Sequence, residues 1–324
     1  MNIIQKLKKK ILNGEQISRE EAFLLTDSPL EELTEAANEI RKKICGNGFD
    51  LCTIINGKCG RCSEDCKYCA QSAHYHATCP QSYPLLNTDT LLKNAEHNDA
   101  QGVLRYSIVT SGKRLSDQEI DQVCKSIREI RDKTSIQICV SFGLLNEMQF
   151  RKLKKAGASR VHCNLESSRR YFPQVCTTHT YEEKIETLKA AKRAGLSICS
   201  GGILGLGETM EDRIDMVLTT RELGVKSVPM NLLNPIPGTP YAQNRPLTNE
   251  EACRCAAIFR FLIPDASIRL AGGRGLLNDK GESCFQSGAN AAISGDMLTT
   301  AGITVETDMA MIKKLGFEAR LWND

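Results

Sequence analysis

The sequence predicts an α/β fold, a (β/α)8 barrel of the TIM type with an N-terminal helical extension. Three observations predict it. Short apolar runs alternate with longer helical patterns, eight such runs follow one another over about 270 residues, and a length of 324 residues suits one large barrel. A doubly wound open sheet is the structural alternative. Chemistry in a barrel lies at the carboxyl ends of the strands, which directs the search for a site.

Each strand–helix repeat carries local signals of its own. The candidate strands are the segments 52–56, 104–109, 136–141, 160–165, 197–202, 227–232, 267–271 and 291–294. Capping boxes, with a hydroxyl at the helix start and a carboxylate three residues on, predict helices that begin after Ser18, Ser116, Thr180 and Thr248. Gly195 and Gly224 follow helical patterns as C-terminal caps. We therefore expect a helical extension over 1–50 and a barrel with a C-terminal segment over 51–324.

Composition excludes several classes of protein. The 42 basic and 39 acidic residues leave a net charge of +3, which gives no reason to expect a nucleic-acid partner. The sequence has no apolar run long enough to span a bilayer, and its basic N-terminal segment lacks the apolar stretch of a signal peptide. We therefore expect a cytoplasmic protein without a membrane partner. Fifteen cysteines in such a chain indicate metal or redox chemistry rather than a disulfide framework.

Three cysteines after the first predicted strand have the spacing of a metal site. Cys62, Cys66 and Cys69 form a C-x3-C-x2-C motif, and three thiolates can hold three corners of an iron–sulfur cube while one iron stays open. Structural zinc is the alternative, and it needs a fourth ligand, for which Cys59, His74, His76 or Cys79 is close in sequence. Spacing alone leaves both metals open.

The motif, with the aromatic Tyr68 before its last cysteine, is typical of the radical S-adenosylmethionine (SAM) superfamily. Within that superfamily the chain resembles the biotin synthases from about residue 15 to its end. The resemblance rests on the segments 66–72 (CKYCAQS), 108–112 (IVTSG), 164–166 (NLE), 177–181 (TTHTY), 199–209 (CSGGILGLGET), 227–231 (SVPMN), 238–240 (GTP), 268–274 (IRLAGGR) and 298–300 (LTT). It implies a SAM-binding 4Fe-4S cluster on Cys62, Cys66 and Cys69.

The same resemblance implies the residues that contact SAM. They are Tyr68, Asn164, Glu166, Arg193, Ile203 and Glu208. Asn164 and Glu166 alternate along the fourth strand, so they share one face and suit the ribose hydroxyls. The backbone of Tyr68 and the glycine-rich segment around Ile203 suit the adenine. Arg193 resembles an arginine that meets the SAM carboxylate, and a solvated arginine at a helix end is its alternative reading.

Biotin synthases also carry an auxiliary cluster, the sulfur donor, usually of 2Fe-2S type on three cysteines and one arginine. Cys139, Cys199 and Arg269 match that set, but Ser107 stands at the third cysteine position. A serine oxygen is a poor replacement for a soft thiolate. Cys163, on the adjacent fourth strand, is the ligand we expect instead, although strand alternation with Asn164 argues for a packing role. Three thiolates favour a four-iron auxiliary cluster, with the 2Fe-2S form as the alternative.

The other cysteines read as packing or surface residues. Five of them are Cys45, Cys52, Cys124, Cys176 and Cys284, while Cys253 and Cys255 lie two residues apart in a helical pattern and so do not share a face. Cys59 and Cys79 flank the cluster loop and have structural roles in this reading.

The resemblance implies dethiobiotin as substrate. Asn231, at the end of the sixth predicted strand, matches an asparagine that hydrogen-bonds the ureido group, which needs both a donor and an acceptor. His162 lies near the site in this reading. A low-potential electron donor such as flavodoxin or ferredoxin and a homodimer are also implied. The rival readings are a hydrogenase maturase-like or methylornithine synthase-like radical SAM enzyme, and a zinc-stabilised scaffold protein.

Overall fold

The computed structural model describes residues 2–77 and 81–322, so Cys79 lies outside the described residues. Its strands are β1 (Gly48–Lys58), β2 (Arg105–Thr110), β3 (Gln137–Ser141), β4 (Arg160–His162), β5 (Ser197–Cys199), β6 (Gly202–Leu204), β7 (Ser227–Leu232), β8 (Ser267–Leu270), β9 (Ala291–Ser294) and β10 (Glu318–Ala319). All pairings between these strands are parallel, and β1 pairs with both β2 and β9, which closes the sheet into a barrel. The predicted (β/α)8 barrel is therefore confirmed, and the open sheet is wrong.

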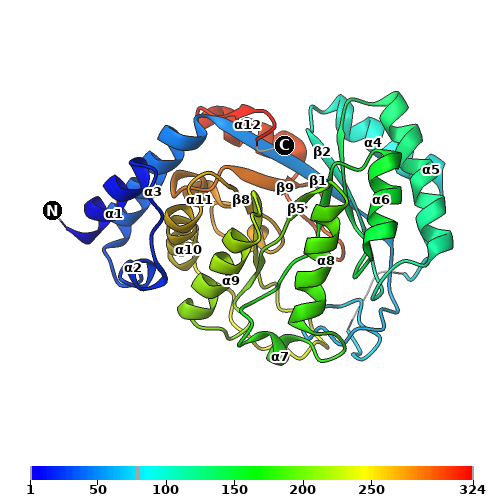
Figure 1. Cartoon of the computed structure of the whole chain (residues 1–324), viewed down its shortest axis with the longest axis horizontal. Coiled ribbons are helices and arrows are strands. Elements are labelled where there is room, and N and C mark those ends of the chain that lie inside the picture. Colours follow the sequence, from blue (N-terminus) through cyan, green and yellow to red (C-terminus); the bar gives the residue numbers. More distant parts are fainter. Residues whose placement is uncertain (1, 78–80, 323–324) are drawn as a thin grey trace.

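The helices lie outside the barrel. They are α1 (Ile3–Leu12), α2 (Arg19–Phe23), α3 (Leu30–Cys45), α4 (Thr88–Ala100), α5 (Asp117–Lys133), α6 (Glu147–Ala156), α7 (Phe172–Val175), α8 (Tyr181–Arg193), α9 (Met210–Glu222), α10 (Asn249–Leu262), α11 (Glu282–Gln286) and α12 (Val305–Lys314). Figure 1 shows α4, α5, α6 and α8 on one side of the barrel and α1 to α3 beside α10 on the other. The capping boxes expected at Ser18, Ser116, Thr180 and Thr248 are all present.

The N-terminal helices pack against the barrel's outer layer. Ile4, Leu7 and Ile11 repeat at helical spacing and are buried on one face of α1, which contacts α3 and α10. A hydrogen-bonded ion pair of Arg19 with Asp215 joins the start of α2 to α9, with 2.6 Å between Nε and Oδ1. The predicted N-terminal helical extension is thus confirmed as α1 to α3, which end at Cys45 before β1 begins at Gly48, while the division at residue 50 stays a prediction.

The fifth barrel strand differs most from its predicted form. One strand was expected over 197–202, but the structure has two short pieces, β5 and β6, which both pair with β7. Gly201 lies between them, and a Cβ on it would lie 2.0 Å from the carbonyl oxygen of Pro229. The backbone of β7 therefore approaches this break more closely than any side chain would allow.

No helix among the described residues is both long and apolar enough to cross a membrane.

Candidate active site

A cavity of about 390 Å³ opens at the carboxyl ends of the strands and continues into the barrel. It has a mouth, built by the cluster loop after β1, and a floor, built by inward-facing side chains of the strands. Among its lining residues are Cys62, Cys66, Tyr68, Cys69, Asn164, Glu166, Ile203 and Asn231, and towards the floor Ser107, Cys139, His162, Cys199 and Arg269. Most of the side chains predicted from the sequence therefore share one cavity.

The cluster loop is held in shape by its own backbone. The N–H of Cys62 donates to the carbonyl of Gln71 at 2.9 Å, and the N–H of Ala73 donates to the carbonyl of Cys62 at 2.8 Å. Cys69 closes a turn on the carbonyl of Cys66 at 3.0 Å. The thiol of Cys62 also accepts from the N–H of Gly112 at 3.3 Å, after β2. The three cysteines of the motif thus reach the mouth from one closed loop.

Two carboxylates tie this loop to the segment after α7. Asp65 accepts from the N–H groups of Thr177 at 2.8 Å and Thr178 at 3.2 Å. Although burial opposes it, the hydrogen bonds from Thr177 hold the pKa of Asp65 well below its ordinary value. Glu64 lies 2.6 Å from Nδ1 of His179. The 177–179 segment therefore positions the cluster loop.

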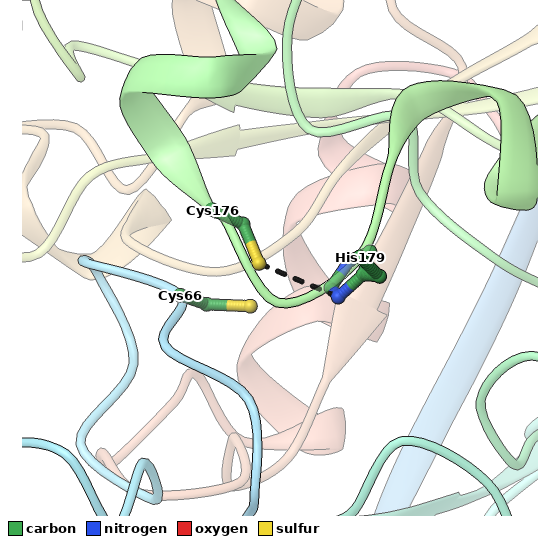
Figure 2. A group of neighbouring side chains, drawn as sticks. All are labelled: Cys66, Cys176 and His179. Carbon is green, nitrogen blue, oxygen red and sulfur yellow. Dashed lines mark hydrogen bonds between the residues drawn. The ribbon is translucent and has the colours of Figure 1, made fainter.

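Cys66 points towards Cys176 and His179, and Figure 2 shows the three side chains facing one another. Their ligand atoms all lie within 4.8 Å of one another, and Cys176 Sγ is 3.3 Å from Nδ1 of His179. The contact with Cys66, helped by His179, lowers the pKa of Cys176 to about 4 despite burial. The sequence reading placed Cys176 among packing residues, although a C-x2-H spacing was visible. Cys176 is buried and lies against Cys66 of the cluster loop.

Glu166 and Asn164 reach the cavity from the end of β4, as expected. Glu166 has a φ of 69°, a conformation rare for a residue with a side chain, and its Oε2 is buried without a hydrogen-bond partner in the described part of the chain. Its Oε1 lies 3.6 Å from Nζ of Lys184, a buried cation on α8 that also lines the cavity. Lys184 is a site residue that sequence reasoning missed. Lys184 lies in the first turn of α8, and the sequence alone does not show which side of this helix faces the cavity.

Tyr68 and Ile203 pack together with Leu206, Leu233 and Val175 in a small apolar cluster at the mouth. Glu208 does not line the cavity. It accepts from the N–H of Gly205 at 2.9 Å and from Nε of Arg213 at 2.7 Å, and so holds the turn that follows Ile203.

Arg193 is not brought to the cavity. It lies in the last turn of α8 on the outer surface, half exposed, and pairs with Glu147 at 2.8 Å and Glu186 at 2.5 Å. The prediction that Arg193 meets SAM is therefore not supported, because this turn of α8 points away from the strands.

The floor is built from strand residues. Cys139 on β3, Cys199 on β5 and Arg269 on β8 are all buried and line the cavity, and so does Cys52 on β1. Nδ1 of His162 lies 3.5 Å from Sγ of Cys199. Although burial opposes it, this contact lowers the pKa of Cys199 to about 7.

Beneath these thiols one carboxylate meets three guanidinium groups. Asp50 is fully buried and lies 2.9 Å from Nε of Arg105, 3.2 Å from Nη2 of Arg269 and 3.6 Å from Nη1 of Arg160. Although burial opposes ionisation, Arg269, Arg105 and Arg160 hold the pKa of Asp50 below its ordinary value. Because three arginines share one aspartate, the floor favours an anionic occupant.

Cys163 and Ser107 stand apart from this arrangement. Cys163 follows the last residue of β4 and touches the cavity, but its charged neighbours are Lys184 and Glu166 at the mouth. Ser107 lies opposite Cys139 in the β2–β3 register and is buried. Ligation by Cys163 remains a prediction.

Asn231 lies at the end of β7 with its amide partly engaged. Its Nδ2 donates to the carbonyl of Gly202 at 3.0 Å, and its Oδ1 accepts from the N–H of Gly272 at 3.0 Å. An amide has a second donor and a second lone pair. The side chain is thus held rigid and can still offer a donor and an acceptor to a ligand.

The residues present fit iron–sulfur clusters at both ends of the cavity. Thiolates are the ligands of such clusters, and the three cysteines at the mouth leave a fourth position open. At the floor, Nη2 of Arg269 is buried and lies 3.2 Å from Asp50 Oδ2, but it makes no well-aligned hydrogen bond among the described residues. The thiols and the three guanidinium groups around Asp50 all suit an anionic group.

Comparisons with known proteins define the class first. Residues 58–219 match the model of the Radical SAM superfamily, and residues 229–318 match the Biotin and Thiamin Synthesis associated domain. The fold is that of the crystal structure of methylornithine synthase, with a TM-score of 0.84 at 16% identity over 97% of each chain. The FeFe-hydrogenase maturase HydG from Carboxydothermus hydrogenoformans gives 0.81 at 16% identity, over 97% of this chain and 78% of that one. The chain is thus a radical SAM protein.

The relatives narrow the class. The chain is 57% identical to the biotin synthase of Akkermansia muciniphila over 99% of this chain and 100% of that protein. It is 54% identical to the biotin synthase of Brachyspira hyodysenteriae over 99% and 96%. The chain belongs to the biotin synthase family, and the rival radical SAM readings are not favoured. Membership implies a SAM-binding 4Fe-4S cluster and an auxiliary cluster.

Proposed function

We propose that this chain converts dethiobiotin to biotin by SAM-dependent sulfur insertion, with electrons from a low-potential donor. One observation carries the proposal. A single cavity has three cysteines of one loop at its mouth, buried strand thiols at its floor and a fixed amide on its wall. When bound, the mouth cluster supplies the electron that splits SAM, and the auxiliary cluster supplies the sulfur atom.

The mouth residues bind and orient SAM. Cys62, Cys66 and Cys69 hold the cluster. The unpaired Oε2 of Glu166, with Asn164 beside it, accepts from the ribose hydroxyls.

Three further groups at the mouth act on the rest of SAM. Lys184 takes the place expected for Arg193, because it is the buried cation beside Glu166 and can meet the SAM carboxylate. Tyr68 and Ile203 offer an apolar slot for the adenine. Glu208 acts indirectly, by fixing the turn after Ile203.

The floor holds the auxiliary cluster, for which we propose the four-iron type with one open iron. Cys139 and Cys199 supply two thiolates, and Arg269 lines the same part of the cavity. The sequence reading takes Cys163 as the third thiolate. A 2Fe-2S cluster is the alternative, and it would need Arg269 as a fourth ligand.

The substrate lies between the two ends of the cavity. Asn231 presents its free donor and acceptor to the ureido group, while its two existing bonds prevent the amide from rotating. Its replacement by alanine is expected to raise the KM for dethiobiotin at least about fivefold, since one amide hydrogen-bond pair is worth about 1–3 kcal/mol. SAM binding should change little, which a binding titration with SAM alone would check.

The partners follow from the same reading. Lys58, Arg61, Lys113 and Arg114 line a hollow beside the cluster loop, together with Glu183, which pairs with Lys113. The positive charge that remains favours an acidic electron donor such as flavodoxin or ferredoxin. We propose a homodimer in the cytoplasm, as the family resemblance implies. Sedimentation of the holoenzyme tests the dimer.

The test of the function is an anaerobic reaction of the reconstituted full chain with dethiobiotin, SAM and a reductant. Biotin, detected by mass spectrometry, is the expected product, and Cys69→Ala protein should form none. Splitting of SAM without any biotin would contradict the proposal and favour a different radical SAM reaction.

A further inference from the structure

The floor residues can be placed by strand register. In a (β/α)8 barrel, the side chains that point inward form layers of four, and each layer takes its members from alternate strands. Because the shear is eight over eight strands, the next member of a layer is found by following the pairing across two strands and then moving two residues along the chain. Starting on β3, Cys139 pairs with Arg160 on β4, and Arg160 pairs with Ser197 on β5. Two residues further along β5 is Cys199. Cys139 and Cys199 therefore belong to one layer.

The next step leads to the arginine of the floor. Cys199 pairs with Ser227 on β7, and Ser227 pairs with Ser267 on β8. Two residues further along β8 is Arg269. The two cysteines and the arginine that match the family's auxiliary site are thus three members of a single layer.

The fourth member of this layer is a cysteine. Arg269 pairs with Ala291 on β9, and Ala291 pairs with Asp50 on β1. Two residues further along β1 is Cys52. The same step from Cys52, through the pairings with β2 and β3, returns to Cys139 and closes the ring. The layer therefore consists of three thiols and one guanidinium group.

The side-chain environment agrees with the register. Cys52 is buried, lines the cavity and lies near the Cys139 thiol and the Arg269 guanidinium. Its Sγ lies 3.3 Å from the carbonyl oxygen of Thr53, a weak contact that leaves the sulfur lone pairs available.

We propose that Cys52 is the third thiolate ligand of the auxiliary cluster, with Cys139 and Cys199, and that Arg269 completes the layer around it. This inference rests on the proposed function for the presence of an auxiliary cluster. Each thiol gives its proton to solvent as the iron–sulfur bond forms, and no change of oxidation state is required.

Cys163 does not belong to this ring. Although Cys163 touches the cavity, its charged neighbours are Lys184 on α8 and Glu166 at the mouth, and not the arginines of the floor. It also follows His162, the residue that pairs with Cys199, and so lies above the level of the layer. Cys163 is assigned to packing between β4 and α8.

Ser107 stands where related proteins have a cysteine ligand, and Cys52, not Cys163, replaces that cysteine. Ser107 lies on β2, between the strands that carry Cys52 and Cys139, and pairs with Ile54 and Cys139. Cys52 stands on the other neighbour of β2. The thiol has thus moved by one strand in the direction opposite to Cys163.

The test uses three alanine variants of the full-length chain, Cys52→Ala, Cys163→Ala and Cys124→Ala, reconstituted anaerobically with iron-57. Cys124 is a buried cysteine on α5 that does not line the cavity, so it is the matched control. Iron per chain and Mössbauer spectra are recorded without dethiobiotin. Cys52→Ala is expected to lose the auxiliary component, about half of the iron, and to keep the mouth cluster, while the other two variants keep both.

Retention of the auxiliary component in Cys52→Ala protein would overturn the inference. If that variant loses both clusters, the ligands of the auxiliary cluster are instead identified in crystals of the wild-type protein. Iron located by anomalous scattering and bonded to the Cys52 sulfur supports the inference, and iron bonded to Cys163 and not to Cys52 overturns it. Neither readout involves biotin, so a wild-type protein that binds its auxiliary cluster on Cys52 but makes no biotin would refute only the proposed function.

Discussion

At the mouth of the barrel, Cys62, Cys66 and Cys69 come from one short loop, whereas at the floor the buried thiols come from separate strands. The loop is tied by turns and by two carboxylates, and in this structure Cys66 turns to Cys176 and His179. The floor thiols are fixed by strand register and cannot turn away without a change in the barrel. A cluster that must bind and release SAM suits the first arrangement, and a buried sulfur donor suits the second.

The largest effect that separates the two regions is expected from Cys69→Ala. This change removes one ligand of the mouth cluster. Loss of a residue that only hydrogen-bonds a metal ligand costs up to about 100-fold, so loss of the ligand itself should lower the rate of SAM cleavage by more than that. The floor component of the iron spectrum should persist. Production of 5'-deoxyadenosine measures the loss, with Cys124→Ala as the control. Loss of both clusters at once would show that the two regions are not independent.

Asp50→Asn should destabilise the fold most, because it leaves three buried guanidinium groups without their shared carboxylate. We expect a loss of about 3–5 kcal/mol in the free energy of unfolding of the apo protein. Urea unfolding under anaerobic conditions measures it. Asp265→Asn, which removes the surface ion pair with Lys226, is the control and should cost at most about 1 kcal/mol. Equal effects in the two variants would refute the special role of the floor.

A smaller, pH-dependent effect is expected at the mouth. Asp65→Asn weakens the hydrogen bonds from Thr177 and Thr178 and should cost about 1–2 kcal/mol near pH 7. Because the pKa of Asp65 is lowered in the folded protein, the ionised carboxylate contributes its stability above its unfolded pKa of about 4. That contribution is lost as the pH falls towards the folded pKa. The difference between the two proteins should therefore shrink below about pH 4, and a constant difference down to pH 3 would contradict this.

The smallest effect is expected on the outer surface. Arg193→Ala should change the KM for SAM less than about twofold, since this side chain pairs with Glu147 and Glu186 outside the cavity. Lys184→Met, matched in length, should raise that KM at least about tenfold, because it removes the buried cation beside Glu166. Steady-state kinetics of SAM cleavage compares them, and the reverse order would restore Arg193 to the site.

Much of the fold could be predicted from the sequence because its signals are local. Apolar runs found every barrel strand, and hydroxyl–carboxylate pairs found the starts of α2, α5, α8 and α10. The break between β5 and β6 could not be predicted, because it depends on how closely Pro229 of another strand approaches Gly201.

The site residues also fall into those that local sequence signals reveal and those that depend on contacts between distant segments. The mouth cysteines are close in sequence, so their spacing reveals them. Cys52 was read as a packing residue because its neighbours in the layer come from β3, β5 and β8, and only register brings them together. Arg193 and Lys184 lie on the same helix, and sequence alone could not tell which of them faces the strands.

The most direct test of the central claim is a single-turnover reaction of wild-type protein reconstituted with sulfur-34 sulfide. If the floor thiols hold the group that donates sulfur, the biotin formed will carry the heavy isotope, in an amount close to one molecule per auxiliary cluster. Biotin that contains only ordinary sulfur, or SAM cleavage with no biotin at all, would contradict the account.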